Sequence, residues 1–330
     1  MTAAVTAARP RRELVAGFAR RNAWPLGLLG FLALLFVFTK LIQPGYGIPG
    51  IQGLATSVLP LALAAVAQAI VVISGGIDLS IGSMMALTSA VSASLMEGST
   101  EEGAAAIVLG VLLLGLGVGA VNGLVVVATK VPDIVVTLAM SFVWAGCALL
   151  VMKTPGGAAA TWLKELPIGS LVSLWIPKAA VLLVVIVAAI WLPVRRSRLG
   201  LSIYAIGSDR LAAFRSGVPV GRTRVAAYAL TGLFSALGGL ALTASTGIGS
   251  PVPGPYTLMS VAAVVLGGVS LAGGRGGVFG PVIAVVILQL IRTDMTFLNV
   301  NTNLAVVVQG LILIGVVMIG SLLQIRRARR

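Results

Sequence analysis

The sequence is dominated by long apolar runs that are separated by short groups of glycine, proline and charged residues. A helix needs about 20 apolar residues to cross a bilayer, whereas the strands of a membrane β-barrel show alternation over about 10 residues, which is not seen here. The pattern therefore predicts an all-α membrane protein with about ten transmembrane helices. We expect these spans at about 24–42, 54–73, 81–96, 104–128, 134–152, 179–193, 226–247, 258–272, 278–293 and 304–323, the shorter ones being half-helices or re-entrant segments.

Composition excludes several classes of function. Only 10% of the 330 residues are charged and 58% are hydrophobic, whereas soluble proteins carry roughly 25% charged residues. Histidine is absent, which removes imidazole proton relays, histidine-bound zinc and histidine-assisted nucleophiles. The single Cys147 cannot form an internal disulfide or a cysteine-based metal site, and no metal site is expected. No G-x-x-x-x-G-K-[ST] motif occurs, so the chain is not expected to hydrolyse nucleotide by itself.

The distribution of Lys and Arg predicts the orientation in the membrane. With the N-terminus inside and ten spans, 18 of the 23 basic residues fall on the cytoplasmic side, as the positive-inside rule requires. The net charge of +14 is thus explained by topology, and nucleic acid is not an expected partner. We expect a cytoplasmic basic arm at 1–23, one transmembrane domain at 24–325 with a cytoplasmic loop at 194–225, and a cytoplasmic basic tail at 326–330.

One stretch, Ile73–Ser83, breaks the apolar pattern with two glycines, a carboxylate and two hydroxyls. Irregular backbone at membrane depth survives only inside protein or beside water, and an ionisable residue there suggests function. Asp78 and Ser80 could cap the helix that begins near Ile81. Asp78 could instead contact substrate, form part of a gate or a subunit contact, or, as a minor alternative, carry a proton.

An internal echo of this stretch lies 192 residues later, where Gly267-Gly268 falls opposite Gly75-Gly76. A match in each half, after an apolar run, predicts two related halves with a pathway between them, as in many transporters. Glycines continue to Gly277, around Arg275. They could form a phosphate-binding nest, but a tight turn between closely packed helices is the favoured interpretation.

The loop Arg198–Pro219 predicts a short amphipathic helix. Ser208 or Asp209 can cap a helix at about 210–215, and Gly217 with Pro219 can close it. Leu211 and Phe214 would share one face of that helix. Such a helix could lie on the lipid surface or dock into a partner protein, and the residues alone do not choose between the two.

Polar side chains on the apolar spans are candidates for lining a polar route, although bonds between helices explain most such residues. They are Gln68, Asn122, Thr137, Ser141, Gln289 and Gln309. A route of amides and hydroxyls with almost no charge suits an uncharged polyol better than an ion.

Three strings carry a resemblance to a known family. SGGIDLSIGSMMALTSA, AIGSDRLAAFRSGVPV and LGGVSLAGGRGGVFG resemble, in order and spacing, the permease subunits of bacterial ABC importers for monosaccharides. These are the ribose, xylose, arabinose, galactose, galactofuranose and autoinducer-2 type. The similarity runs from about 25 to 323. The glycine-rich string is also loosely shared with branched-chain amino acid permeases.

The resemblance implies a multi-pass permease in the bacterial inner membrane that alternates access as a homodimer or heterodimer. A periplasmic or lipid-anchored binding protein would deliver the sugar, and separate cytoplasmic subunits would bind ATP and Mg and supply hydrolysis, so this chain would be neither an enzyme nor a cofactor protein. The amphipathic loop then becomes the ATPase-docking segment. Its expected residues are Gly207, Asp209, Leu211, Ala212, Ala213, Phe214, Ser216 and Gly217.

The expected gate and pathway residues follow from the break and its echo. They are Gly75, Gly76, Asp78, Ser80, Gly82, Ser83, Asn122, Gly267, Gly268, Gly274 and Arg275. Import of another small solute, such as a branched-chain amino acid or nucleoside, is the alternative within this class. A proton-coupled transporter would need a titratable relay, and a membrane enzyme would need clustered acids or histidines, so both fit less well.

Overall fold

The computed structural model describes residues 23–301 and single residues between 304 and 318. The basic arm and tail, Gln309 and most of the predicted last span lie outside the described residues. The described part is all-α, as predicted, with twelve helices and isolated backbone bridges only. Seven helices are long and apolar enough to cross a membrane: α2 (Ala23–Ile42), α3 (Ile48–Ile73), α5 (Glu101–Thr129), α6 (Asp133–Val151), α8 (Lys178–Arg196), α11 (Val220–Thr246) and α13 (Phe279–Phe297).

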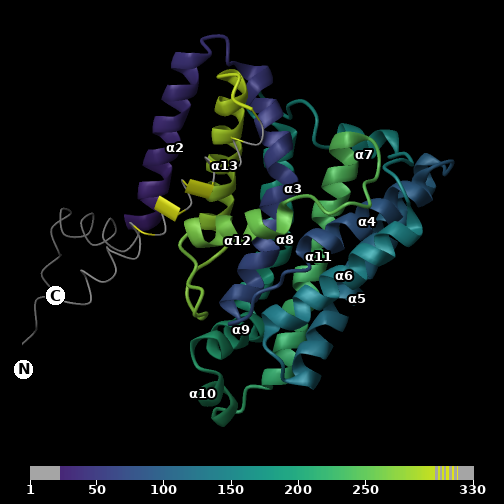
Figure 1. Ribbon diagram of the computed structural model, residues 1–330, viewed down its shortest axis with the longest axis vertical. Coiled ribbons are helices and arrows are strands. Elements are labelled where there is room, and N and C mark those ends of the chain that lie inside the picture. The colour runs from purple at the N-terminus through teal and green to yellow at the C-terminus, as the bar shows by residue number, and fades with distance from the viewer. Residues whose placement is uncertain are drawn as a thin grey trace, which may run out of the picture.

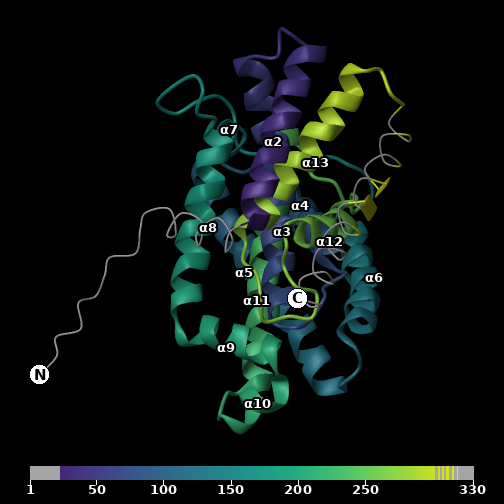
Figure 2. The ribbon, with the colours of Figure 1, turned by 90° about the vertical axis from the view of Figure 1, so that its left-hand side faces the viewer.

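Two shorter apolar helices, α4 (Ile81–Met96) and α12 (Tyr256–Leu266), complete the described membrane part. The remaining helices, α7 (Thr161–Glu165), α9 (Arg198–Ser208) and α10 (Arg210–Arg215), mark opposite ends of the molecule, which we call the α7 end and the α10 end (Figures 1 and 2). The predicted span 258–272 is wrong in its extent. Its helix stops at Leu266, because Gly267 and Gly268 end it.

Helix α3 forms the centre of the fold, since 89% of the residues in its most apolar stretch are buried, whereas the share in α6 is 17%. Helices α5, α6 and α11 lie side by side on one flank, and α2 packs on α13 on the other (Figure 1). A lipid-facing helix keeps its apolar surface exposed in the absence of a bilayer, so the low burial of α6 is expected.

Helices α5 and α11 approach at backbone distance because their facing residues have no side chains. Gly115, Gly119 and Gly123 lie on one face of α5, and a Cβ at any of them would overlap the backbone or Tyr228 of α11. On α11, a Cβ at Gly232 would likewise overlap the backbone of Gly115 and Gly119. Close approach between small residues drives helix association where lipid removes the hydrophobic driving force.

The connection between α11 and α12 packs against α4. Gly249 bonds with Gly156 through both backbone groups, and Ser250 donates its N–H to Ser89 in α4, 3.3 Å away. The segment then reaches the first turn of α4, where a Cβ at Gly82 would meet Thr257. Residues 247–255 therefore follow α4 without forming a helix, with Gly249 and Pro251 buried and residues 252–255 exposed.

Candidate functional site

The break after α3 is a glycine-terminated helix end. Gly75 adopts a φ of +84°, which favours glycine, and donates its N–H to Val72 O, while Gly76 donates to Val71 O. These two bonds make the Schellman motif. They turn the chain sharply away from the helix axis while still satisfying two of its last carbonyls.

Asp78 is fully buried just beyond this turn, and its Oδ1 atom holds Ser80. It accepts from the backbone N–H of Ser80 at 2.8 Å and from its hydroxyl at 2.6 Å. Neither side chain caps α4, so that prediction is wrong. The hydroxyl of Thr257 instead accepts from the N–H of Gly82 at 2.9 Å, so a residue of α12 caps α4.

A chain of side-chain hydrogen bonds extends from Asp78 to two helices, α5 and α6. Trp144 of α6 donates its indole N–H to Asn122 Oδ1 (2.9 Å), and Asn122 of α5 donates its amide to Ser80 Oγ (2.7 Å). Ser80 then donates to Asp78. The amide of Asn122 also reaches Met84 Sδ at 3.8 Å. The connection between α3 and α4 is thus held by side chains of α5 and α6.

Thr137 of α6 holds the same connection through backbone atoms. Its hydroxyl oxygen accepts from the N–H of Leu79 at 3.0 Å and lies 3.2 Å from the carbonyl of Ile77. Thus Asn122 and Thr137, expected from sequence as polar residues on apolar spans, both make bonds between elements. Ser141 bonds within its own helix, to Leu138 O.

An ion pair closes the side of the break that faces the α10 end. Arg224 of α11 binds the carboxylate of Asp133 at the start of α6, and the hydroxyl of Tyr228 donates to Asp133 Oδ2 at 2.8 Å. Gly76 lies directly against this group, since a Cβ there would be 2.9 Å from the Tyr228 hydroxyl. The sequence alone does not indicate this group, because Asp133 is 91 positions from Arg224 and 95 from Tyr228.

Not every polar group in this region is satisfied. Within the described part of the chain, Asp78 Oδ2 has no hydrogen-bond partner, and the amide of Gln68 in the last two turns of α3 has none at either atom. An unpaired buried polar group costs about 1–3 kcal/mol. Both groups lie on or next to the break, where the fold stores this unfavourable energy.

The three sequence motifs meet in space at the end of α3. Gly274 donates its N–H to Ile73 O at 2.9 Å, and Gly207 of α9 lies between these two residues, with no room for a Cβ. Tyr204 of α9 donates its hydroxyl to Gly276 O at 2.9 Å, and burial raises its pKa, which keeps the donor protonated. Close backbone packing, rather than a phosphate nest, is thus the arrangement of the glycines.

The echo of the break is displaced by one residue from its sequence match. Gly268 has a φ of +78° and donates to Val265 O, and Val269 donates to Val264 O. Gly268 is therefore the counterpart of Gly75, with Gly267 in the place of Ser74. Gly267 itself packs against the backbone at Pro281.

The expected docking helix forms as predicted. Asp209 caps α10 by accepting from the N–H of Ala212 at 2.9 Å, and Gly217 closes it with a φ of +82°. Leu211 and Phe214 are 57% and 68% exposed, which leaves an apolar face uncovered. Ala213 and Gly207 lie apart from this apolar face, since both are buried, whereas Ser216 is exposed as the C-cap.

Two pathway candidates take no part in the hydrogen-bond chain around Asp78: Ser83 is buried in α4 and Arg275 is exposed.

A cavity of about 550 Å³ lies toward the α7 end between α3, α11, α12 and α13. We call it the polar cavity. Apart from Gln289, its polar lining was not anticipated as a site. Its lining residues are Pro49, Gln52, Gly53, Thr56, Ser57, Pro60, Ile168, Gly169, Leu242, Ser245, Thr246, Tyr256 and Gln289, none of them charged.

The hydroxyl groups of the polar cavity offer mainly acceptors. Thr56, Ser57, Ser245 and Thr246 each donate to a carbonyl of their own helix at 2.7–3.0 Å. Gln289 likewise uses its amide N–H, which donates to Ser57 O at 2.8 Å. The oxygen atoms of these groups keep free lone pairs. A ligand rich in hydroxyl donors complements such a lining.

The fold is that of a helical membrane protein with interrupted helices, and comparison with known proteins gives the family. Residues 50–317 match the family described as the permease component of the branched-chain amino acid transport system, and the chain belongs to it.

Curated relatives cover most of the chain. It is 30% identical to the ribose import permease protein of Escherichia coli K12 over 91% of this chain and 95% of that one. It is 33% identical to the ribose import permease protein of Bacillus subtilis 168 over 86% and 88%, respectively. It is 28% identical to the autoinducer 2 import system permease protein of Escherichia coli O9:H4 over 93% and 94%. No solved structure matches the chain. The prediction of an import permease is confirmed.

Proposed function

We propose that the chain is the channel-forming permease subunit of an ATP-binding cassette importer for a monosaccharide or a similar small neutral polyol. The observation that carries the choice of solute is the polar cavity, which is lined by amides, hydroxyls and one tyrosine without a charge. Sugars donate through many hydroxyls and present apolar C–H faces to aromatic rings. Tyr256 supplies such a ring beside the acceptors of Gln289 and Ser245.

A branched-chain amino acid, named in the description of the family, fits this cavity less well. Its carboxylate and ammonium would need charged or oriented partners, since burying an unpaired charge is costly. The relatives named for ribose and autoinducer 2 agree with an uncharged solute.

The remaining parts of the proposal concern partners. We infer that α10 docks on a cytoplasmic ATPase subunit through Leu211 and Phe214, whose exposed faces fit a groove on a partner. That ATPase would bind ATP and Mg, so this chain would not itself be an enzyme. A periplasmic or lipid-anchored binding protein would deliver the solute at the α7 end. A second permease copy or a paralogue would complete the channel.

The charge distribution supports an orientation with the α10 end in the cytoplasm. Lys130, Arg210 and Arg224 gather there, and Arg195 with Arg196 ends α8 beside α9. Positively charged connections stay on the cytoplasmic side. We therefore place the protein in the bacterial inner membrane with both termini inside.

The test is uptake of radiolabelled ribose, xylose and leucine by cells that carry the complete transporter. We expect uptake of a sugar and not of leucine. Gln289→Leu should lower sugar uptake about tenfold or more, because it removes an acceptor and leaves a ligand hydroxyl unpaired. Gln43→Leu, an exposed change at the end of α2, is the control and should have no effect. Leucine uptake, or equal effects of the two substitutions, would refute the proposed solute.

A further inference from the structure

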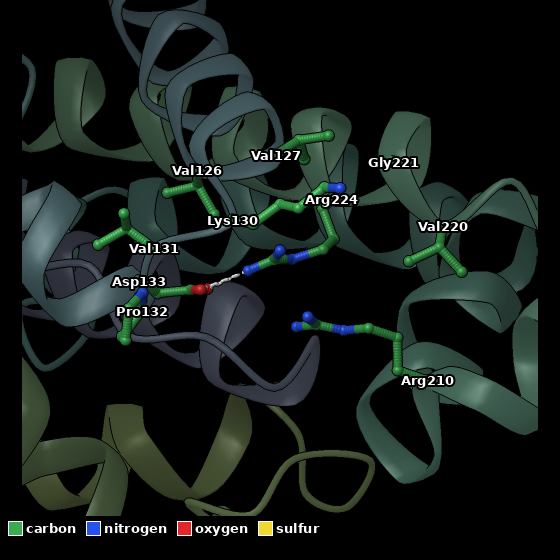
Figure 3. A pocket seen from close by; sticks show the side chains of 10 residues that line it. All are labelled: Val126, Val127, Lys130, Val131, Pro132, Asp133, Arg210, Val220, Gly221 and Arg224. Atoms are coloured by element: carbon green, nitrogen blue, oxygen red, sulfur yellow. Dashed lines mark hydrogen bonds and ion pairs between the residues drawn. The ribbon is translucent and has the colours of Figure 1, made fainter.

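A second cavity, of about 340 Å³, opens at the α10 end where α5, α6, α10 and α11 meet. Figure 3 shows its lining, with the guanidinium of Arg210 directed toward the Asp133–Arg224 pair. We call it the cationic cavity. It is lined by Val126, Val127, Lys130, Val131, Pro132, Asp133, Arg210, Val220, Gly221 and Arg224.

The cationic cavity has more positive than negative charge. Three cations, Lys130, Arg210 and Arg224, face one carboxylate, that of Asp133. Asp133 is already paired with Arg224, and this is the one ion pair within the described part of the chain. Lys130 and Arg210 are thus left without a carboxylate there. Two positive charges remain for a ligand.

Backbone geometry adds to this preference for an anion. The cavity includes Val220 and Gly221, the first two residues of the 27-residue helix α11. The N–H of Val220 already donates to Val218 O at 2.8 Å, so the contribution of α11 is the partial positive charge of the helix dipole at its start, which favours a phosphate.

The cavity lies at the depth of lipid headgroups. Residues 130–132 join α5 and α6, which are both long enough to cross the membrane, so their junction lies at the membrane surface. Beside the cavity, Val131, Ile134, Val135 and Leu138 expose 40–56% of their surface along α6. This apolar strip can take an acyl chain while the cations hold the headgroup.

We propose that the cationic cavity binds the phosphate group of an anionic phospholipid, whose acyl chains lie along α6. Basic pockets between transmembrane helices suit such headgroups. The lipid would connect the α5–α6 junction to α10 through Lys130 and Arg210. Because α10 is the proposed docking helix, the lipid would also set the position at which the ATPase docks. That consequence rests on the proposed function, whereas lipid binding itself does not.

The test is native mass spectrometry of the purified full chain, titrated with phosphatidylglycerol or phosphatidylcholine. We expect preferential binding of phosphatidylglycerol. The double variant Lys130→Gln/Arg210→Gln should weaken it about 30-fold, since each basic residue near a membrane surface contributes about 1 kcal/mol. The matched control, Arg198→Gln/Arg222→Gln, removes the same charge from a neighbouring surface pocket and should leave binding unchanged.

Three outcomes would overturn the proposal. The two lipids could bind equally, or the control pair could weaken binding as much as the cavity pair, which would indicate general surface charge. Inorganic phosphate added to the lipid-free protein could also bind as tightly as phosphatidylglycerol, which would make the ligand a soluble phosphate. Lys130 and Arg210 line the cationic cavity, whereas Arg198 and Arg222 line the neighbouring surface pocket. All four side chains are exposed, so both variants are expected to fold.

Discussion

The α3–α4 connection (residues 74–80) and the α12–α13 connection (residues 267–278) begin alike and then diverge. Both start with a Schellman motif around a glycine of positive φ, at Gly75 and Gly268. The first is then held by side chains, from Trp144 to Asp78. The second is held mainly through backbone atoms, as when Ser270 donates to Arg275 O at 3.1 Å, and one side chain, Tyr204, donates to Gly276 O.

This difference shows how two related breaks acquire separate roles. The first depends on which side chains surround it, so movement of α5, α6 or α11 would be transmitted to it. The second depends on the absence of side chains, because its glycines pack against Gly207 and Pro281. We therefore expect the first connection to respond to helix movement, and the second to act as a rigid wedge between α9 and α13.

The largest effect should come from Asp133→Ala, which leaves Arg224 buried at 7% exposure without a partner. Removing one member of a buried ion pair costs about 3–5 kcal/mol. Thermal unfolding of the detergent-purified protein should show this loss, and hydrogen exchange should rise at 74–80 but not at 267–278. Asp133→Ala/Arg224→Met should recover most of the stability. Equal exchange at both connections would contradict the comparison.

A smaller effect should separate Gly268→Ala from Gly75→Ala. A positive φ costs a residue with a Cβ about 1–2 kcal/mol, and both variants incur this cost. Only at Gly268 would the Cβ also overlap a side chain, the indole of Trp24, whereas the nearest atom at Gly75 is 3.6 Å away. The melting temperature should therefore fall further for Gly268→Ala. The opposite order would show that overlap with Trp24 does not determine the cost at Gly268.

Effects of similar or smaller size should come from the hydrogen-bond chain of the first connection. Ser80→Ala removes a donor to Asp78 and an acceptor for Asn122, and should cost about 1–3 kcal/mol. Asp78→Asn should cost less, because its amide oxygen can accept the same two bonds from Ser80. Sugar uptake by this variant should not depend on external pH. Uptake that is pH-dependent in the wild type and pH-independent in Asp78→Asn would instead indicate proton coupling.

The sequence by itself determined what depends on neighbouring residues. Hydropathy over about 20 residues located the helices α2, α3, α5, α6, α8, α11 and α13, and Asp209 with Gly217 located α10, because capping and burial in lipid act within a few turns. The first break was equally local, since Gly75 and Gly76 interrupt the apolar run. The second was visible only as an echo of the first, and the predicted span 258–272 ran through it.

Only the tertiary structure decided the partners. Thr257 caps α4 from 175 positions away, and Arg224 reaches Asp133 across 91. The one-residue displacement of Gly268 from its sequence match was likewise invisible, because Gly267-Gly268 offers two glycines and only the hydrogen bonds select one. The polar cavity and the cationic cavity each collect residues from four or more elements. A linear pattern cannot specify such contacts, since packing between distant helices brings the side chains together.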